Sequence, residues 1–277
     1  ALIDRGVLAR SIVVPFAPML PAATAVLFKL FKRKDLASIP ASKVKDRIIP
    51  GAVLSQKGRD FQPVAINPLE DVAVLQYTGG TTGTPKAAML THANLYANAQ
   101  QINAWATGLI QGEERVLGVL PLFHVFAMTV VMNMGIAKAA KIILMPRFQL
   151  DEALKLITKE KPTMMPAVPT IFTAINNHPK LKTFNLSSLK FCISGGAPLP
   201  LEVKLRFEEL SGSSVVEGYG LSEASPVVTC NPMDTAPVPG SIGPPLPGTI
   251  VSLRDLDDPT KEVAQGERGE LCVKGPQ

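Results

Sequence analysis

Short apolar runs alternate with longer segments of helical periodicity from residue 72 onward. The runs of strand length cover residues 72–77, 116–120, 142–145, 163–167, 190–194 and 214–217. The helical segments cover residues 91–108, with Thr91 as a possible cap, and residues 127–139, 150–159, 169–177 and 201–210. This alternation predicts an α/β fold, with parallel-rich sheets flanked by helices on both faces.

The pattern changes after Pro226, because prolines crowd the chain between residues 232 and 247. Two strand-like stretches follow, at residues 249–253 and 269–273, and they predict the start of a β-rich subdomain. Because Gln277 directly follows a strand that nothing pairs or covers, we interpret the sequence as a fragment. The predicted parts are an incomplete N-terminal segment (1–63), an α/β body (64–232) and the β-rich start (233–277).

Two apolar stretches approach the length of a membrane span, but neither predicts one. Residues 11–28 carry no charged side chain, yet three prolines would interrupt a single straight helix. Residues 116–137 are better divided into a strand, a loop and a helix. Residues 21–34 predict a short helix with a basic end, for which two interpretations stay open. The helix lies at a membrane surface with its basic end near anionic headgroups, or it docks on its own protein.

Composition and charge narrow the class of protein. A hydrophobic content of 46% with 18% charged residues is typical of a globular protein with a substantial core. The net charge of +5 comes from residues that are spread out, without the basic stripe interleaved with aromatic residues that nucleic-acid binders use. We therefore expect no nucleic-acid partner. The three cysteines lie far apart, which indicates neither a zinc site nor a disulfide framework and favours a reducing compartment.

A segment dense in glycine and threonine follows the first apolar run. Its residues are Tyr77, Thr78, Gly79, Gly80, Thr81, Thr82, Gly83, Thr84, Pro85 and Lys86. Glycines let backbone N–H groups turn toward an anion, threonine hydroxyls add donors or metal ligands, and lysine neutralises charge between phosphates. The spacing differs from that of a Walker A loop, since Gly83 and Lys86 are separated and Ala87 follows. The segment predicts a loop that binds a nucleoside triphosphate.

Two further polar or glycine-rich clusters follow predicted strands, at residues 194–198 and 218–223. Ligands of open parallel sheets bind at the carboxyl ends of the strands, so we expect both clusters and the loop at 77–86 to converge on one cleft. In the last cluster, Tyr219 could stack on a base and Glu223 could hold a magnesium ion.

Six motifs occur together in this order, and the stretch from residue 64 to 277 carries all of them. They are YTGGTTGTPK at 77–86, LTH at 90–92, PLFH at 121–124, SGGAPL at 194–199, GYGLSEASP at 218–226 and GELCVKGPQ at 269–277. In these motifs the sequence resembles the AMP-forming acyl-adenylate superfamily, and within it the bacterial long-chain fatty-acid–CoA ligases.

The resemblance implies the fold of an acyl-CoA synthetase N-terminal domain, incomplete here, with residues 64–232 as the nucleotide- and acyl-binding body. It implies a ligase that uses ATP and Mg²⁺ and takes coenzyme A as co-substrate. A fatty carboxylate would attack the α-phosphorus of ATP to give acyl-AMP and pyrophosphate, and the thiol of coenzyme A would then displace AMP. Electrostatic stabilisation must dominate the first step, because the attacking and leaving groups are both anionic. The implied location is the cytoplasm, at or near the inner face of the membrane, and a homodimer is one assembly that the resemblance allows.

Carried over to this sequence, the resemblance assigns the loop at 77–86 to the β- and γ-phosphates. Thr78 and Glu223 would lie near magnesium, Lys86 would neutralise the departing pyrophosphate, and Ser222 would approach the α-phosphate. The other nucleotide-binding residues would be Gly195, Gly196 and Ala197 along the adenine, Tyr219 against its face, and Gly218 and Gly220 beside them. The catalytic candidates are Lys86, Glu223, Ser222 and His124.

The histidines and the apolar segment at residues 123–135 each leave alternatives open. His124 is either a polar residue near the carboxylate end of an acyl pocket or a core histidine satisfied by backbone. We expect His92 to brace the helix after the phosphate loop and His178 to be a surface turn residue. The apolar side chains of residues 123–135 line an acyl tunnel or are plain core, and Met128 replaces the tryptophan that gates the tunnel in some relatives.

The resemblance places the ribose-binding aspartate, the hinge and the C-terminal lid with its catalytic lysine beyond Gln277. We therefore expect little or no activity from these residues alone, since a closing lid supplies charge and excludes water. Two alternatives are an adenylating enzyme for another apolar or aromatic acid and a non-catalytic nucleotide-binding module. Residues 123–135 hold no acid that could pair with an ammonium group, which disfavours an amino acid substrate. The intact Lys86 and Glu223 argue against a degraded module.

Overall fold

The computed structural model describes residues 8–15, 17–31, 45–51, 62–78, 86–235, 238 and 240–277. The chain divides into two compact units, residues 1–65 and 66–277. The boundaries predicted after residues 63 and 232 remain predictions.

The first unit holds a short pair of strands and one exposed helix. Strands β1 (Ser11–Val13) and β2 (Ile48–Pro50) pair in parallel, and the short 3-10 helices are η1 (Ala17–Met19) and η3 (Lys45–Arg47). Helix α1 (Ala22–Phe31) lies within the helix predicted at residues 21–34, and none of its side chains is buried. Its predicted basic end at residues 32–34 lies outside the described residues.

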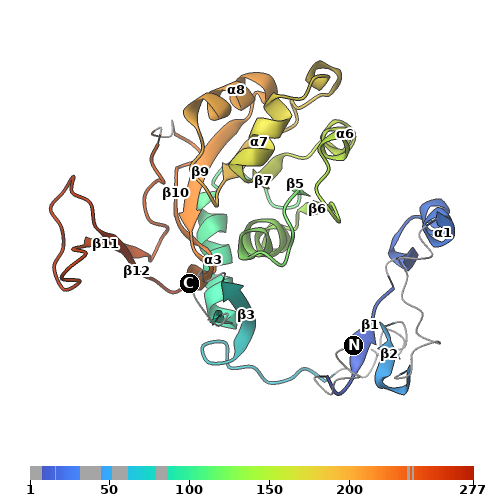
Figure 1. Cartoon of the computed structure of the whole chain (residues 1–277), viewed down its shortest axis with the longest axis horizontal. Helices are drawn as coiled ribbons and strands as arrows, with labels where there is room; N and C mark the ends of the chain where they lie inside the picture. The colour runs from blue at the N-terminus through green and yellow to red at the C-terminus, as the bar shows by residue number, and fades with distance from the viewer. Residues whose placement is uncertain are drawn as a thin grey trace. The chain divides into compact units, whose positions relative to one another are not determined.

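The second unit is built on a six-stranded sheet in the order β10-β9-β8-β7-β5-β6 (Figure 1). Its strands are β5 (Arg115–Gly118), β6 (Lys141–Leu144), β7 (Met164–Ala167), β8 (Phe191–Ser194), β9 (Ser214–Gly220) and β10 (Val227–Cys230). All neighbours pair in parallel except β10, which runs antiparallel to β9. The prediction of a parallel-rich sheet is confirmed.

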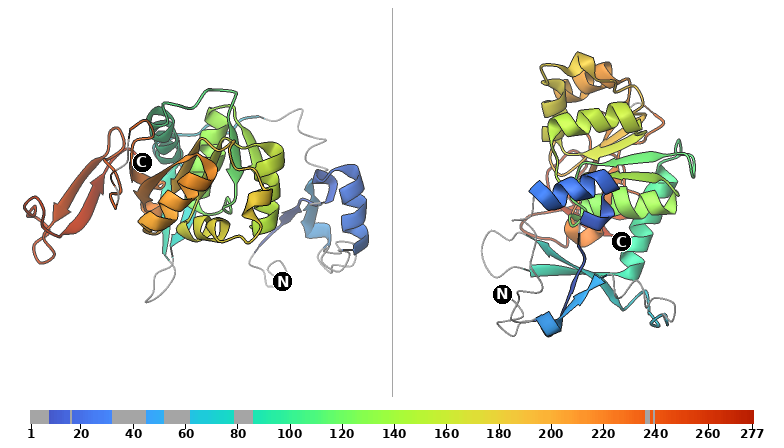
Figure 2. Two further views of the ribbon diagram at one scale, coloured as in Figure 1. Left: turned by 90° about the horizontal axis from the view of Figure 1, so that it is seen from above. Right: turned by 90° about the vertical axis from the view of Figure 1, so that its right-hand side faces the viewer.

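Helices cover both faces of this sheet. Neighbouring residues of each central strand point to opposite sides, and apolar residues on both sides pack against helices. One core contains Leu117, Met165, Cys192 and Val215 together with residues of α6 (Leu150–Glu160), α7 (Pro169–Asn176) and α8 (Leu201–Ser211). The other contains Val116, Met164, Ile193 and Val216 together with residues of α3 (His92–Trp105) and of a helical stretch at residues 125–137. Figure 2 shows α6, α7 and α8, yellow-green to orange, grouped together.

The first predicted strand does not join the parallel sheet, so that part of the prediction was wrong. Strand β3 (Val72–Thr78) instead pairs antiparallel with β4 (Lys86–Thr91), from Val72 opposite Thr91 to Thr78 opposite Lys86. The segment predicted to bind phosphate therefore connects two antiparallel strands, rather than a parallel strand and a helix. A second hairpin joins β11 (Ile250–Arg254) and β12 (Glu270–Lys274), near the two strands predicted in the C-terminal part.

The helix predicted at residues 127–139 is divided into three pieces. They are α4 (Val125–Ala127), the π-helix η5 (Met128–Asn133) and α5 (Met134–Ala137). A π-helical turn adds a residue within a helix and is frequently found at functional sites. Within the described ranges, no helix combines the length and the apolar character that a membrane crossing requires.

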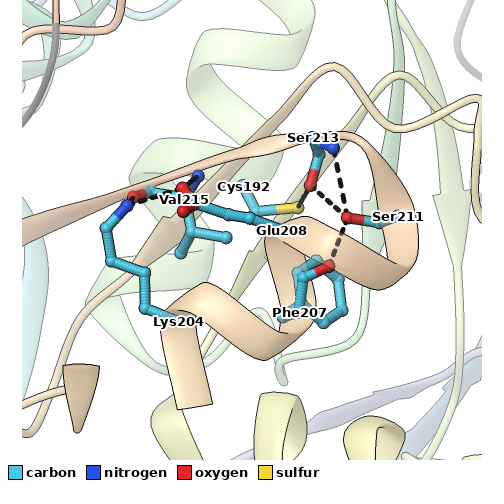
Figure 3. Close-up of polar contacts among 7 residues, drawn as sticks. All are labelled: Cys192, Lys204, Phe207, Glu208, Ser211, Ser213 and Val215. Atoms are coloured by element: carbon cyan, nitrogen blue, oxygen red, sulfur yellow. Dashed lines mark hydrogen bonds and ion pairs between the residues drawn. The ribbon is translucent and has the colours of Figure 1, made fainter. Parts of the chain in front are cut away.

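A buried polar cluster holds the turn between α8 and β9 (Figure 3). Gly212 caps α8 in the left-handed region, with φ at 73°. Lys204 Nζ donates to Glu208 Oε1 at 2.5 Å and to the carbonyl oxygen of Val215 at 2.7 Å. Glu208 Oε1 also accepts from the Val215 N–H at 2.8 Å. This ion pair therefore holds the first residues of β9 against α8, at the end of the strand that lies away from Gly220.

The rest of that cluster packs a thiol against hydroxyls. Ser211 and Ser213 share a hydrogen bond of 2.7 Å between their hydroxyls, and Cys192 Sγ lies 3.8 Å from Ser213 Oγ. Burial raises the pKa of Cys192 to about 12, so its thiol stays protonated near neutral pH. We conclude that this cysteine has a packing role.

Candidate active site

A cavity of about 240 Å³ opens at the carboxyl ends of β8 and β9. Its lining includes Gly195, Gly196, Gly218, Tyr219, Gly220, Ser222 and His124. Two of the three clusters predicted to converge, at residues 194–198 and 218–223, thus meet in one hollow. The carboxyl edge of the sheet is where parallel α/β folds bind ligands.

Glycines bring the backbone to the surface of this cavity. A Cβ built onto Gly195 would lie 3.3 Å from the ring of Phe126 and 3.4 Å from the carbonyl oxygen of Gly218. Gly196 has φ at +83°, which side chains rarely adopt. Because no side chain projects from these positions, a flat ligand can approach the peptide groups directly.

A carboxylate that the sequence analysis did not single out anchors the loop after β8. Glu217 Oε2 accepts from the N–H of Leu199 at 3.2 Å, and so ties the 194–199 loop to β9. Ala197, predicted to contact adenine, lies exposed in this loop and is not among the residues that line the cavity. The bond joins Leu199 to a residue 18 positions further along the chain, and local patterning carries no signal for it.

The residues after β9 divide between two adjoining hollows. Ser222 and Glu223 belong to the short helix η7 (Ser222–Ala224), and Ser222 faces the main cavity. Glu223 lines a second hollow of about 160 Å³ together with Val273 and Gln277. Its side chain is exposed and forms no hydrogen bond or ion pair with the described residues.

The β3–β4 hairpin lies against η7, so the base of the predicted phosphate loop and Glu223 belong to neighbouring elements. Tyr77, Thr78 and Lys86 are described at the end of the hairpin where the loop begins and ends. The predicted loop residues Gly79, Gly80, Thr81, Thr82, Gly83, Thr84 and Pro85 lie outside the described residues.

His124 caps α4 from the rim of the cavity. Its Nδ1 accepts from the N–H of Phe126 at 3.2 Å, so the neutral ring carries its proton on Nε2. The residue is exposed, which excludes the core-histidine alternative. A ring held in this way presents an N–H donor beside the cavity.

The other two histidines lie away from the cavity lining. His92 is the first residue of α3, behind a capping box in which Asn94 N–H donates to Thr91 Oγ1 at 3.2 Å and Thr91 N–H donates to Asn94 Oδ1 at 3.0 Å. The predicted cap at Thr91 is therefore confirmed. His178 was predicted as a surface turn residue, but its side chain is only 8% exposed and its Nε2 lies 3.1 Å from Asp151 Oδ1.

The apolar wall of the cavity comes partly from the segment predicted to line an acyl tunnel or core. Val125, Phe126 and Val130 line the cavity, whereas Met134 is buried in the core. Ile102 of α3 completes the wall, which the sequence analysis did not anticipate. Burial raises the pKa of another lining residue, Cys230, to about 12, so this wall carries no thiolate near neutral pH.

Comparison with known proteins identifies the family. A family model described as AMP-binding enzyme matches residues 12–277. The chain belongs to this family of AMP-binding enzymes. The long-chain-fatty-acid–CoA ligase of Bacillus subtilis is 50% identical over 213 residues, which make up 76% of this chain and 38% of that protein. The chain thus spans about two fifths of that relative's length.

Solved structures of AMP-binding enzymes share the fold. A long-chain-fatty-acid–CoA ligase from Archaeoglobus fulgidus matches with a TM-score of 0.73 and 26% identity, over 96% of this chain and 53% of that chain. An ATP-bound RpMatB–BxBclM chimera matches with a TM-score of 0.71 and 29% identity, over 83% of this chain and 45% of that chain. The predicted resemblance to acyl-CoA synthetases is confirmed.

Magnesium suits the oxygen donors of this AMP-binding enzyme. No group of three or more histidine, cysteine, aspartate or glutamate side chains forms a metal site within the part of the chain that the structure describes. Thr78 and Glu223 lie on neighbouring elements, and a hydroxyl and an uncommitted carboxylate are ligands that Mg²⁺ accepts alongside water and phosphate oxygens. The donor set therefore fits a magnesium ion that is held together with a nucleotide.

Proposed function

We propose that this chain is the nucleotide-binding body of an AMP-forming long-chain fatty-acid–CoA ligase. In the first step a fatty carboxylate attacks the α-phosphorus of ATP, which forms an acyl-AMP and releases pyrophosphate. In the second step the thiol of coenzyme A attacks the acyl carbon, and AMP leaves. The observation that carries the proposal is that the glycines after β8 and the Tyr219 segment of β9 line one cavity, in a chain that is 50% identical to such a ligase over 213 residues.

The cavity suits the adenylate part of the nucleotide. Gly195 and Gly196 take the edge of the adenine, and Tyr219 packs on its face. Ala197, which does not line the cavity, contributes no contact to this arrangement. Gly218 and Gly220 leave the backbone open beside it. At about 240 Å³ the hollow is smaller than the roughly 300–1,000 Å³ of pockets that enclose a whole ligand, so the phosphates extend toward η7 and the hairpin.

The phosphates meet the charged and hydroxyl groups around η7. Ser222 donates to the α-phosphate, and Lys86 with the loop from Gly79 to Pro85 neutralises the β- and γ-phosphates. Thr78 and Glu223 hold the magnesium, which supplies charge neutralisation for the departing pyrophosphate when it is bound. His124 presents its Nε2–H to the fatty carboxylate and orients it toward phosphorus.

The test of nucleotide binding is isothermal titration of the chain with ATP in the presence and absence of Mg²⁺. We expect Glu223→Gln to abolish the magnesium dependence, because the amide is a weaker metal ligand of the same size. Glu209→Gln is the matched control and should leave the magnesium dependence unchanged, because Glu209 on α8 is exposed and is not among the residues that line the cavity. Glu217→Gln would not serve as a control, because Glu217 anchors the loop after β8. Equal ATP affinity with and without Mg²⁺ in the unsubstituted chain would contradict the assignment of Glu223.

A second candidate is an adenylating enzyme for another apolar or aromatic acid. Phe126 and Val130 give the cavity an apolar wall that could also accept a ring. Pyrophosphate exchange with palmitate, benzoate and amino acids separates these cases, and the proposal requires palmitate to be preferred. A non-catalytic module without nucleotide function would instead show no dependence of ATP binding on Glu223.

We further propose that the protein is cytoplasmic and contacts the inner face of the membrane through residues 21–34. Val26, Leu27, Leu30 and Phe31 of α1 are each more than half exposed, and the following residues are basic. An apolar helix with cationic flanks binds anionic lipid surfaces. Flotation with anionic liposomes should fail when Lys32, Arg33 and Lys34 are neutralised.

We also propose that the protein forms a homodimer, which analytical sedimentation would test.

A further inference from the structure

Two side chains from outside the cavity lining hold the backbone that follows Glu223. Asn98 of α3 makes two bonds to Val227, since its Oδ1 accepts from the N–H at 2.9 Å and its Nδ2 donates to the carbonyl oxygen at 2.8 Å. Thr129 of η5 donates from Oγ1 to the carbonyl oxygen of Ser225 at 2.6 Å. Both side chains are fully buried, at 0% exposure. Amide and hydroxyl groups in such positions are stable only when their partners stay in place.

The held segment determines the wall of the cavity. Val227 begins β10 and pairs in register with Gly220 of β9, while the N–H of Leu221 donates to the carbonyl oxygen of Pro226 at 3.0 Å. Tyr219, Gly220 and Val227 all line the cavity. A displacement of Val227 would therefore be passed directly to the residues proposed to contact the adenylate.

Asn98 is itself fixed by a buried network. Its Nδ2 also donates to Gln101 Oε1 at 3.0 Å, and Gln101 Nε2 donates to the carbonyl oxygen of Pro247 at 2.8 Å. Ile102, on the next turn of α3, lines the cavity. The network thus joins the helix that follows β4 to the strand that backs the nucleotide wall. A fully satisfied buried polar network rigidifies the elements that it connects.

We propose that Asn98 and Thr129 are positioning residues for the nucleotide site. They fix the backbone of Ser225 and Val227, and through β10 they hold Tyr219 and Gly220 in place for the adenylate half of the nucleotide. Neither residue touches the reacting atoms. The inference rests on the proposed function, because it requires that the cavity binds a nucleotide.

The experiment measures the affinity of the 277-residue chain for AMP and for inorganic pyrophosphate by ligand-observed NMR titration. AMP depends on the wall that Asn98 holds, whereas pyrophosphate depends on the phosphate loop. Losing the bonds to Val227 in Asn98→Ala should raise the Kd for AMP about tenfold. The Kd for pyrophosphate should stay within about twofold. Thr129→Val, which removes one hydrogen bond, should raise the Kd for AMP by a smaller factor than Asn98→Ala and should likewise leave the Kd for pyrophosphate nearly unchanged.

Asn103→Ala is the matched control, because it removes the same side chain from the same helix. Asn103 Oδ1 is buried without a hydrogen-bond partner among the described residues, so the substitution should leave both affinities unchanged. Thermal unfolding of each variant is recorded in parallel. Should AMP and pyrophosphate affinities fall together, or should Asn98→Ala and Thr129→Val lose stability but not AMP affinity, the positioning role is refuted. If the unsubstituted chain binds neither ligand, the proposed function fails and this inference fails with it.

Discussion

Gly220 and Gly218 lie two residues apart on β9, and the structure predicts opposite outcomes for the same substitution. A Cβ built onto Gly220 would overlap the carbonyl oxygen of Pro226, and it would lie 2.8 Å from the carbonyl carbon of Pro226 and 3.1 Å from Val227 Cα. All of these atoms are backbone, so no side chain can move aside. At Gly218 the nearest atom is the carbonyl oxygen of Thr229 at 3.4 Å, which is an ordinary contact.

The magnitude follows from this geometry. Gly220→Ala must separate β9 from β10 by about 1 Å, and it should lower the free energy of unfolding by about 3 kcal/mol, the upper part of the range for overpacking. Gly218→Ala creates no overlap, and the loss of backbone freedom in the unfolded chain offsets small strain, so the change should be within about 1 kcal/mol. The difference between the two variants should therefore be about 2 kcal/mol or more.

Urea unfolding followed by tryptophan fluorescence is the assay. Trp105 is the only tryptophan in the sequence, and its Nε1 donates to the carbonyl oxygen of Asn231 at 3.3 Å, just after β10. The signal therefore reports on the second unit at the relevant pair of elements. With equal m-values, the two midpoints give the difference in stability. Midpoints that agree for Gly220→Ala and Gly218→Ala would refute the argument.

Three further predictions concern the cluster beside α8 and the thiols. Lys204→Ala leaves the carboxylate of Glu208 unpaired and should lower the free energy of unfolding by about 3 kcal/mol, while a change below about 1 kcal/mol in urea unfolding would contradict a structural role. Burial raises the pKa of Cys192 and of Cys230 to about 12 from 9.0, so the stability that each protonated thiol contributes is complete below pH 9 and decreases from pH 9 to 12. The loss should reach about 1.4 kcal/mol per pH unit for each thiol, and Cys192→Ala should make the pH dependence shallower; an unchanged slope would count against it. Cys272 is only partly buried, so Ellman's reagent should modify it in the native protein well before the other two, and simultaneous reaction of all three would argue against the fold.

Much of the central sheet could be predicted from the sequence because burial on both faces makes its strands continuous apolar runs. The runs at β5 to β9 and the amphipathic helices between them were all located within a few residues. Hydrophobic periodicity does not show which strands pair with one another. Strand β4 has the sequence KAAMLT, whose small residues give no alternation, so the hairpin with β3 was missed and β3 was assigned to the parallel sheet.

In the candidate site, too, the features with a local sequence signal could be predicted, and those that depend on contacts between distant segments could not. Glycine-rich clusters at strand ends are a local signal, and the clusters containing Gly195 and Tyr219 do line one cavity. Asn98 gave no signal, because an asparagine inside a helix is ordinary and its partner, Val227, lies 129 residues further along the chain. Glu217 was likewise read only as the end of a strand. Side chains that act by holding distant backbone become visible only when the fold brings the two segments together.

The separation of the two cores has a consequence for engineering the enzyme. Ile102, Phe126, Val130 and Ile193 line the cavity and also belong to the core beneath α3, where each is at most 9% exposed. Substitutions that reshape this cavity will therefore be limited by tolerance for lost stability. The core beneath α6, α7 and α8 shares none of these residues. Stabilising substitutions placed there could compensate for destabilising changes in the cavity wall, which makes that side of the sheet the natural starting point for directed evolution.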